Sequence, residues 1–281
     1  ISVADETARN ETFGEIDTDV TNLYVQDRLS LGRHDIALAL GYVDHETAGG
    51  HTTWNAEYGL EIAPAWRLVA SAGTAFRAPD ATDRFGFGGN IDLEPEQSRH
   101  YEIAIRHALA RDQRLSLSAF QNDIDELITF VITDPTTFDG QLQNLDRARI
   151  RGVELSYEIV RNSWRLTAEA IYQDPQDLVL REQLLRRAKE NFTLNYWRRF
   201  GRFELGVHLL AAGDRKDFGD IELDSYVLTN LTARIDLGAG WFATAQIENL
   251  LDEDYELVSG YRTQDRTAFV GIAYRGAKSR D

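Results

Sequence analysis

The chain has 281 residues and a formal net charge of −16, from 46 acidic and 30 basic residues. A surface this acidic would repel phosphates, which argues against nucleic acid as a partner. Hydrophobic residues make up 43% and charged residues 27%, so a disordered chain is not expected, and without cysteine neither disulfides nor thiolate metal sites can form.

No window approaches eighteen uncharged apolar residues, which excludes a membrane-spanning helix but not a membrane β-barrel, whose strands carry a weaker signal. The chain begins at Ile1, shows no signal peptide and contains no Met. We therefore expect a mature, trimmed or partial chain.

Runs in which every second residue is apolar recur along the chain, and a period of two is typical of strands. Near Phe192, for example, apolar Phe192, Leu194 and Tyr196 alternate with polar Asn191, Thr193 and Asn195. The predicted strands are residues 2–11, 21–31, 34–45, 51–63, 66–77, 98–108, 113–125, 147–160, 164–173, 186–199, 203–214, 225–236, 241–250 and 266–274. Strands of about ten residues are long enough to cross a bilayer when tilted, so about fourteen of them predict an all-β, antiparallel transmembrane barrel.

The connections alternate in length. Short turns are expected at 32–33, 63–65, 111–112, 161–163, 201–202 and 237–240, and longer polar loops at 79–97, 126–146, 174–185, 215–224 and 251–265. Outer-membrane barrels have short turns at one end and long loops at the other, whereas soluble sandwiches have no reason to separate them.

Aromatic residues fall near the short turns. Trp66, Trp164, Phe203 and Trp241 each open a predicted strand just after such a turn. Amphipathic rings favour the boundary between lipid and water, although aromatics packed over an ordinary sheet core are the alternative.

The motifs of catalytic and metal sites are weak. The six histidines are scattered without ligand spacing, no G-x-S-x-G or P-loop occurs, and Asp217-Phe218-Gly219 is interpreted as a chance match to a kinase fragment. No enzymatic activity is expected. Two acidic loops, 214–224 and 252–254, could hold calcium through carboxylates, but neither has EF-hand spacing, and solvated loop charge is the simpler interpretation.

Charged and amide side chains also occupy the polar faces of predicted strands. A packed core would have to pair each of them, whereas a hydrated or plugged lumen would solvate them. The residues expected to face the lumen are Arg165, Glu169, Asn191, Asn195, Glu204, Arg234 and Glu248.

Several segments resemble those of TonB-dependent outer-membrane receptors. They include F-R-A-P at 76–79, N-I-D-L-E-P-E-Q-S at 90–98 and N-L-D-R-A-R-I-R-G-V-E-L at 144–155. The segments L-L-R-R-A-K at 184–189, E-N-L-L-D-E-D-Y at 248–255 and G-Y-R-T at 260–263 are most similar to the cobalamin (vitamin B12) receptor branch. The matches extend over nearly the whole chain.

This resemblance implies a 22-stranded barrel of the bacterial outer membrane, with an N-terminal plug that TonB opens using the proton-motive force. Residues 1–281 would then be a portion of the transmembrane barrel, without plug or TonB box. The implied partners are TonB, a cobalamin or siderophore ligand, and outer-membrane lipid including lipopolysaccharide. The family usually ends on an aromatic residue, but here seven residues follow Tyr274.

The resemblance also suggests ligand contacts at Arg186, Tyr261 and Arg262. Arg186 is expected at the loop-side start of a strand, where its guanidinium could donate to the amide-rich or phosphate-bearing periphery of a corrinoid. A solvated arginine at the rim is the alternative for this residue.

Three functions remain open on the sequence alone. The first is transport of a large scarce nutrient, with cobalamin favoured over a ferric siderophore. The second is a passive or engineered pore without energy coupling, and the third is a soluble β-domain with a structural or adhesive role.

Overall fold

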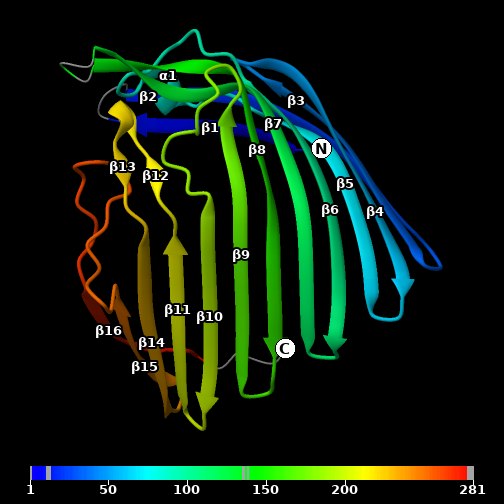
Figure 1. Cartoon of the computed structure of the whole chain (residues 1–281), viewed down its shortest axis with the longest axis vertical. Helices are drawn as coiled ribbons and strands as arrows, with labels where there is room; N and C mark the ends of the chain where they lie inside the picture. The colour runs from blue at the N-terminus through cyan, green and yellow to red at the C-terminus, as the bar shows by residue number, and fades with distance from the viewer. Residues whose placement is uncertain (1, 11–13, 135–136, 138, 277–281) are drawn as a thin grey trace. The chain divides into compact units, whose positions relative to one another are not determined.

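The computed structural model describes residues 2–10, 14–134, 137 and 139–276. Over these residues the chain forms a 14-stranded antiparallel sheet whose strand order follows the chain, together with a separate two-stranded pair, β12 and β13 (Figure 1). The predicted all-β class and strand number of the main sheet are therefore confirmed. Among the described residues no helix has the length and apolar character needed to span a membrane.

The first strands of the main sheet are β1 (Ser2–Asn10), β2 (Gly14–Leu31), β3 (His34–His45), β4 (Gly49–Ala63), β5 (Trp66–Arg77), β6 (Glu96–Ala110), β7 (Gln113–Asp134) and β8 (Asp139–Val160). The remaining ones are β9 (Trp164–Asp177), β10 (Glu190–Phe200), β11 (Phe203–Ala212), β14 (Tyr226–Gly238), β15 (Trp241–Glu248) and β16 (Thr267–Tyr274).

Three of the predicted loops contain regular structure. A short helix, α1 (Ala81–Phe85), follows β5, and β12 (Arg215–Lys216), a 3-10 turn (Phe218–Asp220) and β13 (Glu222–Leu223) lie between β11 and β14. The prediction of a loop over 126–146 is wrong, because β7 and β8 extend through most of it. Glu126 has a φ of 58°, which interrupts the alternation of apolar and polar residues along β7. The β-branched residues after Glu126 therefore do not continue the pattern that predicts the first part of the strand. Positions 135, 136 and 138 lie outside the described residues.

The chain divides into two compact units, which are described separately. The first contains Ile1–Ile105, Ser118–Gly152 and Asp174–Leu184, and the second contains Arg106–Leu117, Val153–Gln173 and Leu185–Asp281. Strands β6 to β9 contribute residues to both.

In the first unit, strand register separates an apolar face from a polar one. Val25, Leu40 and Trp54 are successive cross-strand neighbours on β2, β3 and β4, and all three are more than 40% exposed. On the other face Arg67 of β5 forms an ion pair with Asp35 of β3 at 2.5 Å. A soluble sheet would bury its large apolar side chains, so this exposed apolar face is the one expected to contact lipid.

The second unit also has an apolar face, formed by β9, β10, β11, β14, β15 and β16. Phe192 of β10 lies opposite Ala170 of β9 and Ala211 of β11, and Ala211 lies opposite Val227 of β14. The only cluster of buried residues in the described part of this unit is small and joins Ala188, Ala212 and Tyr226 near the loops.

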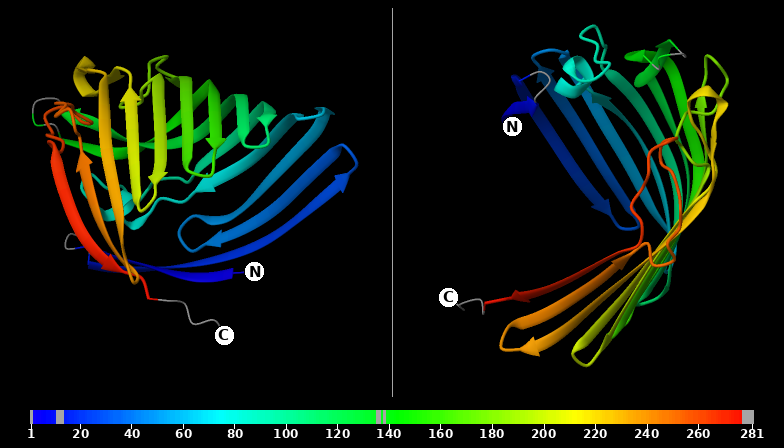
Figure 2. Two further views of the ribbon diagram at one scale, coloured as in Figure 1. Left: turned by 90° about the horizontal axis from the view of Figure 1, so that it is seen from below. Right: turned by 90° about the vertical axis from the view of Figure 1, so that its left-hand side faces the viewer.

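The strands of the second unit are joined by tight turns at one end and by long segments at the other. Gly201 has a φ of 59°, a left-handed conformation that a two-residue turn between β10 and β11 requires. The segments between β9 and β10, β11 and β14, and β15 and β16 lie at the opposite end, where Figure 2 shows the last two in yellow and orange. The predicted separation of short and long connections is present in this unit.

Candidate ligand-binding loops and polar strand face

Arg186 lies in the long segment between β9 and β10, four residues before β10 begins at Glu190. The prediction that it opens a strand is wrong. Its φ is 59°, and its backbone N–H donates to the carbonyl of Lys216 at 2.7 Å instead of to a neighbouring strand of the sheet. The chain therefore turns at Arg186 toward the β11–β14 segment.

The side chain of Arg186 contacts Asp217, which lies at the centre of three loops. Arg186 Nε donates to Asp217 Oδ1 at 2.8 Å, and the backbone N–H groups of Phe218 and Ser259 donate to the same carboxylate at 2.9 and 2.7 Å. The Asp217 side chain is only 2% exposed. We call Arg186, Asp217, Phe218 and Ser259 the loop clamp, because they join the β9–β10, β11–β14 and β15–β16 segments.

Hydrogen bonds to the carboxylate explain how the charged Asp217 side chain can be buried. Burial alone would raise the pKa of this carboxyl, but the hydrogen bonds from Ser259, Phe218 and Arg186 outweigh it and hold the pKa below the ordinary value. The carboxylate is therefore ionised at neutral pH.

A second set of contacts lies beside the clamp. The guanidinium of buried Arg215 lies 4.8 Å from the centre of the Tyr226 ring, and Tyr226 lies 4.6 Å from the ring of Tyr255. Arg215 also donates through Nη2 to the carbonyl of Asp224 at 3.0 Å. These rings connect the β11–β14 segment to the β15–β16 segment independently of Asp217.

Asn249 closes the base of the β15–β16 segment. It has a φ of 49°, is 5% exposed, and exchanges hydrogen bonds with Glu253 in both directions at 2.8 and 2.9 Å. Its backbone N–H donates to Asn230 Oδ1 at 2.9 Å. The E-N-L-L-D-E-D-Y segment is thus a structural turn that fixes where the loop leaves the sheet.

Tyr261 and Arg262 lie in the same loop, two and three residues beyond Ser259. Both are exposed, and Tyr261 reaches 72%. The Tyr261 N–H donates to the carbonyl of Val258 at 3.1 Å, and Thr263 Oγ1 donates to the carbonyl of Tyr255 at 2.6 Å. The structure therefore brings Arg186 to the loop of Tyr261 and Arg262, but it directs Arg186 to the clamp and leaves the other two exposed.

The seven polar strand residues all lie on one face of the sheet of the second unit. The register pairs Thr193 with Glu169, Trp197 with Arg165, and Glu204 with Arg234, and the same face carries Asn191, Asn195 and Glu248. Several are paired: Asn195 Oδ1 lies 2.7 Å from His208 Nδ1, Gln246 donates to Glu248 at 2.8 Å, and Arg199 forms an ion pair with Glu204. His208 belongs to this network, and strand alternation could have placed it there.

The acidic loops do not gather into a metal site in the described part of the chain, where no group of three or more His, Asp or Glu side chains could hold an ion. Several of their carboxylates accept hydrogen bonds from the backbone. Asp214 accepts from the N–H of Ser225 at 2.8 Å, and Asp252 accepts from the N–H of Arg266 at 2.9 Å. These carboxylates shape the loops.

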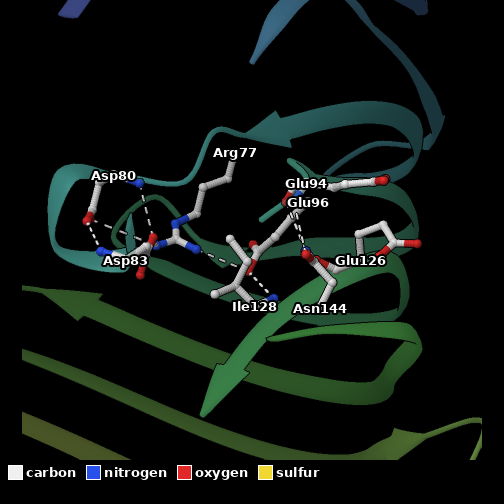
Figure 3. A network of polar contacts seen from close by, with 8 residues as sticks. All are labelled: Arg77, Asp80, Asp83, Glu94, Glu96, Glu126, Ile128 and Asn144. Atoms are coloured by element: carbon white, nitrogen blue, oxygen red, sulfur yellow. Dashed lines mark hydrogen bonds and ion pairs between the residues drawn. The ribbon is translucent and has the colours of Figure 1, made fainter. Parts of the chain in front are cut away.

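In the first unit, the receptor-like motifs form one polar network (Figure 3). Arg77 donates to Asp83 at 2.5 Å and to Glu96 at 3.1 Å, while Glu96 accepts the N–H of Ile128 at 2.9 Å. Asp83 in turn caps α1 together with Asp80. Arg77 therefore links α1 to the start of β6, and Glu96 links the start of β6 to β7.

Asn144 completes this network from β8. It exchanges hydrogen bonds with the backbone of Glu94 at 2.9 Å in both directions and donates to the carbonyl of Glu126 at 2.8 Å. Nearby, Ala148 is 1% exposed and packs with Leu127 and Leu184. These motif positions hold loops to strand ends, which is a structural role rather than a ligand contact.

Comparison with known proteins gives the same fold. The family model described as "TonB dependent receptor-like, beta-barrel" matches residues 2–250. The vitamin B12 transporter BtuB of Vibrio vulnificus is 33% identical over 242 residues, which cover 83% of this chain and 38% of the transporter. The chain thus spans well under half the length of this relative.

Solved structures show the same likeness at lower identity. The siderophore receptor PirA of Acinetobacter baumannii has a TM-score of 0.74 at 16% identity, covering 95% of this chain and 47% of PirA. The copper transporter OprC has a TM-score of 0.73 at 14% identity, covering 95% of this chain and 53% of OprC. At such identities the likeness concerns the fold alone. Because the family model covers most of the residues, the chain belongs to the TonB-dependent receptor β-barrel family of the bacterial outer membrane.

Proposed function

We propose that this chain is part of an outer-membrane receptor that imports cobalamin. The observation that carries the proposal is the 33% identity to a vitamin B12 transporter over 83% of the chain. The structural neighbours include siderophore and copper proteins, but at 14–16% identity they do not indicate a substrate.

In this proposal the ligand binds at the loop end of the second unit. Tyr261 offers an exposed ring and Arg262 an exposed guanidinium, suited to the apolar edge and to the amide or phosphate acceptors of a corrinoid. Arg186 assists through the loop clamp, because an arginine engaged by a buried carboxylate orders the loop that carries the other two.

The polar strand face would line the path of the ligand. Charged side chains are tolerated on this face if water or a plug solvates them. The Asn195–His208 hydrogen bond and the Arg199–Glu204 ion pair keep the face polar and leave the Glu204 charge paired. Opening of the path would depend on a plug and on TonB, as the family resemblance implies.

A ferric-siderophore receptor is the second candidate, because siderophore receptors are among the proteins that share this fold. A passive pore is the third. Uptake of labelled cyanocobalamin into cells whose only receptor contains this chain distinguishes them. We expect uptake that requires TonB and is not reduced by excess ferric siderophore. Uptake that persists without TonB would favour a pore, and competition by the siderophore would favour the second candidate.

A further inference from the structure

The second unit contains three tryptophans, and one of them lies on the polar strand face. Trp164 and Trp241 lie on the apolar face, where each ring contacts a tyrosine ring. Aromatic rings on that face near the strand ends are expected at the boundary between lipid and water. Trp197 follows Asn195 by two residues on β10 and therefore lies on the polar face, where the lipid boundary does not explain it.

The ring of Trp197 covers part of β11. Its cross-strand neighbour there is Gly206, which is buried and pairs in turn with Thr232 of β14. A Cβ atom at position 206 would clash with Thr232 Oγ1 and would lie 3.3 Å from Cε2 of Trp197. Glycine at this position therefore provides the room that the indole occupies against the strand.

The other side of the indole is open. Trp197 is 47% exposed, and among the described residues none accepts a hydrogen bond from its indole N–H and none stacks on its ring. A buried tryptophan ordinarily satisfies its N–H within the protein. An exposed ring with an available donor, set among polar side chains, is suited to contact a ligand.

Two arginines lie beside the ring. Arg165 is the neighbour of Trp197 on β9, and its Nη2 lies 3.5 Å from Glu158 Oε1. Arg199 lies two residues after Trp197 and forms an ion pair with Glu204. The two arginine side chains are 58% and 65% exposed, so each retains N–H groups for an acceptor other than its carboxylate. The apolar ring is therefore surrounded by hydrogen-bond donors.

These side chains border a hollow of about 200 Å³ at the short-turn end of the sheet. Its lining includes Arg165, Trp197, Arg199 and Glu204, together with the turn 161–163. The backbone N–H of Arg199 donates to the carbonyl of Ser163 at 2.7 Å, which holds the end of β10 to this turn. The β12–β13 pair and the long loops lie at the opposite end of these strands (Figure 1). The hollow is therefore separate from the loop clamp and from the exposed loop residues.

We propose that Trp197, Arg165 and Arg199 form a second subsite for the transported ligand, which we call the transit subsite. This inference rests on the proposed import of a corrinoid along the polar strand face. The indole packs against the flat face of the macrocycle, and the two guanidinium groups donate to amide or phosphate oxygens at its edge.

The donors of the transit subsite favour such a ligand over a segment of protein. A protein segment presents N–H groups as well as carbonyls, and its N–H groups need acceptors. The carboxylates nearest the ring, Glu158 and Glu204, are already engaged by arginines. A ligand whose edge carries mainly acceptors leaves no donor unsatisfied here.

The position of the subsite predicts an effect on passage and not on capture. Ligand first binds at the loop end in the proposed function, and the transit subsite lies at the other end of the strands. Its loss should therefore slow import while the affinity of the receptor for external ligand stays the same.

Surface binding and uptake of labelled cyanocobalamin, in cells whose only receptor contains this chain, test the subsite. Trp197→Leu should lower the maximum uptake rate about fivefold, the size expected for loss of one aromatic contact, with unchanged surface affinity. Trp197→Phe keeps a flat ring and should retain most of the uptake. Gly206→Ala places a Cβ atom against the indole and should also lower the maximum rate, although Trp197 is present.

Trp164→Leu is the matched control, because Trp164 is the residue before Arg165 on β9 and lies on the apolar face. Its surface binding and uptake should equal those of the wild type. Heat-dependent gel migration shows that each variant is folded in the membrane. Entry of vancomycin, a large antibiotic of unrelated chemistry, should be the same in all of these strains.

Three results would overturn the transit subsite while the proposed function stands. These are unchanged maximum uptake in both Trp197→Leu and Gly206→Ala, weakened surface binding in Trp197→Leu, and increased vancomycin entry in that variant. The last result would show that the ring packs against protein and seals the barrel. A wild type that neither binds nor imports cyanocobalamin would overturn the proposed function, and the transit subsite with it.

Discussion

Arg186 and Asp217 lie 31 residues apart in sequence and meet through an Nε–Oδ1 hydrogen bond of 2.8 Å. The carboxylate is almost completely buried, while the arginine is 39% exposed. The same carboxylate accepts the N–H of Ser259 from a third loop. Arg186, which the sequence predicts to contact the ligand, is therefore part of the loop clamp. The clamp also holds Ser259, in the loop that carries Tyr261 and Arg262.

Asp217→Asn should loosen the loop clamp. The amide has one acceptor oxygen for three donors and no charge, so the N–H of Ser259 or the guanidinium of Arg186 loses its partner. We expect hydrogen exchange at Ser259 to accelerate by about tenfold, since each net hydrogen bond to a charged group is worth about 1.5 to 3 kcal/mol.

The matched control is Asp220→Asn, which removes an exposed carboxylate from the same loop at a φ of 58° that asparagine tolerates. Its exchange at Ser259 should match the wild type. If Asp217→Asn also leaves the rate unchanged, the clamp does not hold the loop.

The clamp should resist mild acid. Because hydrogen bonds lower the pKa of Asp217, its stabilising contribution is present above the ordinary aspartate value of 3.8 and is lost only as the pH falls below it. Protection of the Ser259 amide, corrected for intrinsic exchange, should stay constant from neutral pH to about pH 5 and fall in stronger acid. A loss of protection already complete at about pH 5 would contradict the depressed pKa.

Strand facing can be tested at two adjacent positions of β10. Leu194→Arg should lower the free energy of unfolding by about 2 to 4 kcal/mol in refolding titrations into vesicles, because it places a charged side chain toward lipid. Asn195→Arg should cost only about 1 kcal/mol, mainly from the lost hydrogen bond to His208. Equal costs at the two positions would refute the assigned faces.

The exposed loop residues should affect ligand binding without affecting the clamp. Tyr261→Ala and Arg262→Ala should each weaken cyanocobalamin binding by about tenfold, the usual effect of removing an aromatic or arginine anchor. Hydrogen exchange at Ser259 should stay unchanged in both. Faster exchange would show that these variants act through loop order, and unchanged affinity would remove them from the site.

Local patterns predicted most of the sheet. Strands β3 and β5 have the predicted bounds, since alternation and a flanking turn mark both of their ends. The strand predicted at 113–125 is shorter than β7, because the positive φ of Glu126 interrupts the period of two. Alternation also placed the seven polar residues on one face, as the cross-strand register shows.

The loop contacts could not be predicted in the same way. Asp217 bonds to residues 31 and 42 positions away, and Asn144 bonds to Glu94 across 50 positions. No periodicity connects such pairs. Asp217-Phe218-Gly219, interpreted as a chance match, is a tight turn in which Gly219 has a φ of 74° and Asp217 is the clamp carboxylate. In this segment Gly219, which precedes Asp220, is the residue whose type indicates a turn.

Calorimetric titration of the purified receptor that contains this chain, with cyanocobalamin and in parallel with a ferric siderophore, tests whether the chain provides the ligand-binding loops of a cobalamin receptor. We predict saturable heat with cyanocobalamin, weakened in Arg262→Ala, and none with the siderophore. Saturable binding of the siderophore without heat from cyanocobalamin would contradict a cobalamin receptor.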